Sequence, residues 1–243
     1  MRDNKISRTQ LMALLWAGVM APAAELLPAL LLPGAGRGAW LAVLLAAPLV
    51  LASGWLMGSL AGREGLARRL VGLLGKWAGG GVLILYIVWG LFLLSLRLRL
   101  CAQRLFSSGE RDGALWFFLL STAALLLWMG RGRLDAFARA GQLFLTALLA
   151  AAGAVLALSL FQARPERLLP LWWAEPGPVV RSALSAAGVM GWGLFLPFLM
   201  GEVRDQGENK NWPWLFWGLG GASLLAGAQA GILGNLGAEL APR

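Results

Sequence analysis

Two apolar stretches of the chain start with the same four letters and carry both glycine and proline: AGVMAPAAELLP at Ala17–Pro28 and AGVMGWGLFLP at Ala187–Pro197. Proline lacks the N–H that would bond to the carbonyl four residues earlier in a helix, and glycine loosens the backbone. In a bilayer, the freed carbonyls must face protein or a water-filled cavity. The residues that carry these freed carbonyls are Gly18, Ala24 and Gly193. Both stretches therefore suggest interrupted membrane helices, although glycine and proline are also common in ordinary membrane helices.

Composition places the chain in a membrane. Of its 243 residues, 58% are hydrophobic and 14% are charged, whereas about 25% are charged in a typical soluble domain. The net charge of +9 would suggest nucleic acid as a partner of a soluble protein. Here the arginines gather between apolar runs, so we expect them to face water and lipid headgroups, with the lipid bilayer as partner and no nucleic acid.

Apolar runs of about 20 residues are long enough to cross the hydrocarbon core of a bilayer. We therefore predict an all-α integral membrane protein with about seven transmembrane helices in a single domain, residues 1–243. A short interfacial helix is expected at about 63–76, because its leucines share one helical face. The predicted spans are about 11–32, 39–60, 79–100, 114–130, 138–161, 183–201 and 213–235.

The segments between spans differ slightly in positive charge between the two sides of the membrane. With the N-terminus inside, the inner segments carry more than half of the 21 lysines and arginines, which predicts a cytoplasmic N-terminus in a multi-pass cell-membrane protein. Ala21-Pro22-Ala23 imitates a signal-peptide cleavage site, but the apolar run continues to Leu32, which favours an uncleaved first span. Tryptophans are expected near the membrane surface at 40, 77, 116, 128, 172, 173, 212 and 214.

Several kinds of chemistry are excluded by what the sequence lacks. It has no histidine and only one cysteine, Cys101, so it has no intramolecular disulfide, no cysteine cage for a metal and no Ser-His triad. The spans contain almost no titratable side chains. We expect no enzyme activity, no catalytic residues, no cofactor and no metal site.

Two polar residues inside spans are candidates for binding. Glu25 lies near the centre of the first span, where a charge costs on the order of 3 kcal/mol, so it could bind a substrate amine or a coupling proton. The alternative is that the span is shifted and Glu25 reaches the outer interface. Tyr86, the single tyrosine, could point its hydroxyl into a cavity, although a hydrogen bond in the core is the simpler role.

Glycines recur every four residues in two spans. They are Gly54, Gly58 and Gly62 in the second span, and Gly227 and Gly231 in the last. This spacing is typical of close helix–helix packing in membranes, so we predict packing rather than chemistry there.

Short motifs in matching order resemble a known family. They are KISRTQ at Lys5–Gln10, Pro28, GRGAW at Gly36–Trp40, LLGKWAGG at Leu73–Gly80 and LPFLMGEVRD at Leu196–Asp205. They resemble the B-subunit (GerAB-like) family of spore germination proteins, in the amino acid–polyamine–organocation transporter superfamily. The resemblance implies a five-plus-five inverted-repeat fold with broken helices 1 and 6. It also implies a germinant-sensing role beside other receptor subunits in the inner spore membrane.

The chain differs from that family in three features. It shows seven spans where the family has ten, as if the last three helices were lacking. It has Ala21-Pro22 where the first helix often has a Gly-Thr-like break, and no charge near Gly188 in the sixth.

The resulting hypothesis is a germinant-receptor subunit that binds a small germinant, such as an amino acid, between spans one, three and six. Two alternatives stay open: an amino-acid permease completed by oligomerisation, and a structural membrane subunit without ligand. The candidate ligand-binding residues are Gly18, Ala21, Pro22, Glu25, Tyr86, Gly188, Gly191 and Gly193.

Overall fold

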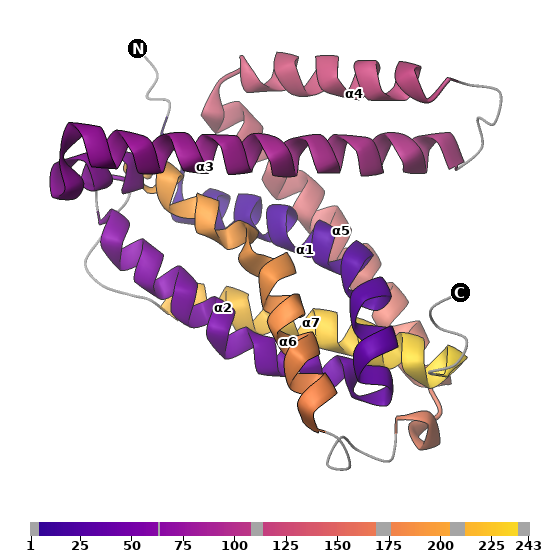
Figure 1. The fold of residues 1–243 in the computed structure, drawn as a ribbon. Coiled ribbons are helices and arrows are strands. Elements are labelled where there is room, and N and C mark those ends of the chain that lie inside the picture. Colours follow the sequence, from indigo (N-terminus) through magenta and orange to yellow (C-terminus); the bar gives the residue numbers. More distant parts are fainter. Residues whose placement is uncertain (1–4, 63, 108–113, 169–175, 205–211, 238–243) are drawn as a thin grey trace.

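The protein folds into helices that pack as a bundle with a two-helix arm at one edge (Figure 1). The computed structural model describes residues 5–62, 64–107, 114–168, 176–204 and 212–237. The long elements are α1 (Arg8–Ala35), α2 (Ala39–Ala61), α3 (Leu66–Ser107), α4 (Leu115–Gly130), α5 (Leu134–Gln162), α6 (Pro176–Met190), the 3₁₀ helix η4 (Gly191–Glu202) and α7 (Trp212–Leu236). Two short 3₁₀ turns, η1 (Gly36–Gly38) and η2 (Pro165–Arg167), follow α1 and α5.

Length and composition confirm an all-α membrane protein. In the described residues, 4 helical segments are long and apolar enough to cross a membrane, and the bent pair α6–η4 makes up to 5. The first of these segments, Arg8–Ala61, contains both α1 and α2, which Figure 1 shows running in different directions on either side of η1. The shorter apolar helix α4 has 16 residues.

The core is made by four helices, α1, α2, α6 and α7. α1 packs on α6, and α2 packs on both α6 and α7, so that buried side chains from all four form one cluster. Many of these side chains are alanine, which lets the backbones approach closely. α5 covers α1 and α7, whereas α3 and α4 lie side by side outside this bundle (Figure 1).

α1 is a continuous helix, so the prediction of a broken first helix is wrong. It begins with a capping box, in which Ser7 and Gln10 each bond the other's backbone N–H, and it continues past Pro22, Pro28 and Pro33. Each proline removes a single backbone bond, and close packing against α6 and α2 holds the helix where those bonds are missing.

Span six is interrupted as predicted. α6 ends at Met190, the chain bends by 40°, and η4 continues as twelve residues of 3₁₀ helix. Such helices rarely exceed three or four residues because their hydrogen bonds are poorly aligned. In a 3₁₀ helix the missing N–H of Pro197 frees the carbonyl three residues earlier. The freed carbonyl is therefore that of Leu194, not that of Gly193 as expected for an α-helix.

α3 is divided at Gly75, whose φ of 78° and ψ of 170° are not helical. This conformation is essentially restricted to glycine. Residues 66–74 therefore form a separate short helix, where the interfacial helix was expected, and fold back on the start of the long one. Gly79 makes this possible, because a Cβ there would lie 2.8 Å from Cα of Val71.

The glycines spaced by four lie at close helix contacts, as predicted for most of them. Gly54 lies against the Trp214 ring of α7, and a Cβ built on Gly54 would overlap that ring. Gly227 and Gly231 face Leu156 and Ser159 of α5. Gly62 serves a different purpose, because its φ of 55° ends α2.

The pair Gly54 and Gly58 gives a test of this packing. Gly54→Ala would force Trp214 to move, and Trp214 is held by a hydrogen bond from its Nε1 to the Leu51 carbonyl at 3.0 Å. We expect a loss of about 1–3 kcal/mol, as for other overpacked cores, seen as a lower melting temperature in detergent. Gly58→Ala is the matched control, because its Cβ would meet only the Met200 sulfur, at 4.0 Å. Equal melting temperatures for the two variants would contradict the packing.

Candidate functional site

A cavity of about 40 Å³ lies between α1, α2, α7 and the junction of α6 with η4. Both repeated stretches contribute to its wall: Val19 and Met20 from the first, Met190 and Gly193 from the second. Two segments about 170 residues apart in the chain thus meet at one site. The site is set by packing, because α1 and α6 are the most extensively packed pair of helices.

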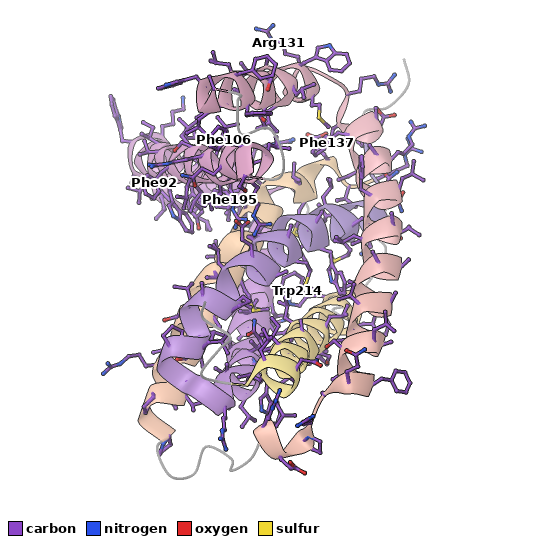
Figure 2. The ribbon with its side chains drawn as sticks, turned by 90° about the vertical axis from the view of Figure 1, so that its right-hand side faces the viewer. Phe92, Phe106, Arg131, Phe137, Phe195 and Trp214 are labelled. Atoms are coloured by element: carbon purple, nitrogen blue, oxygen red, sulfur yellow. The ribbon has the colours of Figure 1, made fainter. Side chains whose placement is uncertain are left out.

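Three tryptophans complete the wall: Trp16, Trp214 and Trp217. The Nε1 of Trp16 donates to the Trp217 carbonyl at 2.9 Å, and these two rings meet edge to face with centroids 5.3 Å apart. Trp214 lies inside the bundle (Figure 2) and donates to the Leu51 carbonyl. Because both of these indole N–H groups are bonded to backbone, the rings offer the cavity mainly carbon surface.

The cavity suits an apolar group or a cation more than an anion. None of its lining residues carries a charge. Aromatic ring faces attract ammonium groups within about 6 Å of the ring centre. A volume of about 40 Å³ accommodates about three or four waters at roughly 10–15 Å³ each, so a larger ligand requires the walls to separate. The wall that is least firmly hydrogen-bonded is the 3₁₀ segment η4.

The structure brings some of the predicted residues to this cavity and separates others from it. Gly193 lines it, and Gly191 lies at the bend where η4 begins. Pro22 is buried in the bundle but does not line the cavity. The predicted residues that are exposed, away from the cavity wall, are Gly18, Ala21 and Gly188.

Tyr86 packs against η4 from the other side. Its ring lies 5.9 Å from that of Phe195 and 5.1 Å from that of Phe198, and Trp89 also stacks on Phe195. Figure 2 shows Phe195 between α3 and the rest of the bundle. Span three therefore supports η4 from outside. It does not line this cavity, contrary to the prediction. Besides α1 and the α6–η4 junction, the cavity is lined by α2 and α7.

Glu25 is paired with a cation. Its Oε1 lies 3.0 Å from Nε of Arg104 on α3, and Arg97 on the same helix also interacts electrostatically with it. Glu25 is 18% exposed and Arg104 is 65% exposed, so the carboxylate is the more sheltered partner. Arg104 lies beyond the predicted third span at about 79–100, but α3 continues to Ser107 and carries it to Glu25. The ion pair relieves much of the cost of placing a carboxylate in a span.

A buried polar side chain on α7 was not anticipated. Gln229 is 1% exposed, and its Oε1 has no hydrogen-bond partner in the described part of the chain. It lies on the face of α7 that carries Ala226 and Leu233 into the four-helix core. The sequence could have indicated it, because Gln229 is the single amide side chain in the apolar run from Leu224 to Leu233. Among the described residues, no three His, Cys, Asp or Glu side chains form a group that could hold a metal ion.

Of three comparisons with known proteins, the one with family models finds a match. A family model described as "Spore germination protein" matches residues 5–215, which includes every helix lining the cavity except most of α7. No curated protein matches the chain, and no solved structure does.

A double-mutant cycle tests the ion pair of Glu25 and Arg104. Because the pair is neither fully buried nor fully exposed, we expect Arg104→Gln to lower the stability in detergent by about 1–2 kcal/mol. Glu25→Gln in the same chain should restore part of that loss, since no carboxylate then remains unpaired. Arg99→Gln, an exposed arginine on the same helix, is the control and should have little effect. Additive effects of the two substitutions would show that the groups do not interact.

Proposed function

The chain belongs to the family of spore germination proteins, and we propose that it is a membrane subunit of a spore germinant receptor that binds a small germinant such as an amino acid. The observation that supports this proposal most directly is the meeting of both repeated stretches at one tryptophan-walled cavity. On this proposal the protein binds without catalysis, in the inner spore membrane, beside other germination receptor subunits.

The walls of the cavity suggest how such a ligand would be held. α6 ends at Met190 on the cavity wall, and the last carbonyls of a helix carry partial negative charge. These carbonyls and the faces of Trp16 and Trp214 would favour an ammonium group. The apolar side chains of Val19 and Met20 would contact an aliphatic part of the ligand.

Binding would act on the backbone at the bend. A ligand larger than a few waters must displace η4 from α1, and Gly191 and Gly193 supply the backbone freedom for that movement. The aromatic contact of Tyr86 with Phe195 and Phe198 would then change as well. Receptor activation would therefore be a change in the position of η4, with binding energy as its source.

A ligand screen by thermal unfolding of the purified protein tests the proposal. A compound at about 100 times its dissociation constant should stabilise the fold by roughly 2.7 kcal/mol. Gly193→Val places a side chain at the cavity wall, next to Leu15 and Trp214, and should abolish the shift. Gly188→Val is the matched control, because a Cβ there meets nothing within 4 Å.

The outcomes separate the possible roles. A shift with one amino acid that survives Gly188→Val and is lost in Gly193→Val would support the proposal. Accumulation of that amino acid in vesicles would favour a permease instead. The absence of a shift across the amino acids and nucleosides would contradict ligand binding by this chain.

A further inference from the structure

The end of η4 is held by the segment that precedes α1. The N–H of Ile6 donates to the Glu202 carbonyl at 2.9 Å, and the N–H of Arg204 donates to the Ile6 carbonyl at 2.8 Å. These two bonds form a parallel β-bridge between Ile6 and Val203. We call this pairing of Ile6 with residues 202–204 the clasp.

The side chain of Ile6 joins three elements at the clasp. Ile6 is 0% exposed and belongs to one buried cluster with Leu11 of α1, Ala138 of α5 and Val203. Leu199 of η4 packs against the same cluster. One side chain therefore helps to hold α1, α5 and η4 together at this end of the bundle.

The end of η4 also rests on the turn between α2 and α3. Gly201 lies so close to this turn that a Cβ built on it would be 2.8 Å from the carbonyl oxygen of Glu64. A Cβ built on Gly65 would in turn lie 3.2 Å from the backbone nitrogen of Gly201. Backbone meets backbone at this contact. The clasp and the turn together fix the end of η4.

The clasp connects two segments that both line the cavity. Ser7, which follows Ile6, is the N-cap of α1, so a displacement of Ile6 is passed directly to the start of that helix. α1 contributes Val19 to the cavity wall, and η4 contributes Gly193. Gly193 lies nine residues before Glu202, which is roughly 18 Å along a 3₁₀ helix. The cavity and the clasp are therefore at opposite ends of η4.

We propose that the clasp is a conformational lock on the cavity. While Ile6 is paired, it limits how far η4 can separate from α1, and its release allows η4 to move along its whole length. Release is a local event, because it breaks two backbone hydrogen bonds and exposes one isoleucine without unfolding a helix. The consequence for the germinant rests on the proposed function, since a ligand larger than a few waters needs the walls to separate.

Hydrogen–deuterium exchange of the full chain in detergent, without ligand, tests the lock. In Ile6→Ala we expect amides along η4, including those at Gly193 and Leu194, to exchange about tenfold faster, because loss of a buried side chain raises the population of the opened state. Leu233→Ala is the matched control. It removes the same number of carbons from a side chain that is also 0% exposed, but on α7. It should lower the melting temperature without selectively speeding exchange in η4.

The extent of the faster exchange decides between a lock and simple fraying. Faster exchange confined to residues 202–204 would overturn the proposal, as would unchanged exchange in η4 or an equal effect of Leu233→Ala. If Ile6→Ala does not fold, Ile6→Val makes a smaller change and should give a smaller effect at the same amides.

The exchange measurement needs no ligand, so its failure is distinct from a failure of the proposed function. If a compound stabilises the unmodified chain, Ile6→Ala should bind it at a lower concentration, because less free energy is spent on opening the cavity. Unchanged or weaker binding in Ile6→Ala, together with faster exchange in η4, would overturn the link between the clasp and the cavity.

Discussion

Inside a bilayer every backbone N–H and C=O must find its partner within the protein, and the rest of this structure depends on that constraint. Both repeated stretches contain proline, but only the second one interrupts its helix. In α1 the helix continues past three prolines, because each removes only one bond and Gly18 is the one glycine near Pro22. In span six three glycines precede Pro197, and there the chain changes to a 3₁₀ helix. The glycines, more than the proline, decide which stretch breaks.

The elements that the sequence predicts best are those set by local rules. Apolar length locates each long helix, since a span needs about 20 apolar residues, although α6 begins at Pro176, well before the predicted start at 183. Gly75 ends the short helix at residues 66–74 because few other residues adopt its conformation. The spacing of Gly54 reveals a close helix contact, although it does not show that the partner is the ring of Trp214.

Contacts between residues far apart in the chain could not be predicted from the sequence. The position of Trp214 at the start of the last span does not reveal that its indole N–H donates to the Leu51 carbonyl of α2. Arg104 lies beyond the predicted bounds of the third span, yet it pairs with Glu25 of α1. Both depend on how α7 and α3 are tilted and placed relative to α1 and α2. Tilt follows from packing with neighbours and not from the composition of a single helix.

η4 is the element on which these distant contacts converge. Its residue Gly193 lines the cavity, Phe195 and Phe198 pack on Tyr86 of α3, and its end is hydrogen-bonded to Ile6. A rigid α-helix in this position would need to move as one body, whereas a 3₁₀ segment with weaker backbone bonds can shift locally. Three surfaces of the molecule are therefore coupled through one segment of low intrinsic stability. A change at any of them alters the free energy of the same backbone, which is the physical requirement for a membrane protein that senses a ligand.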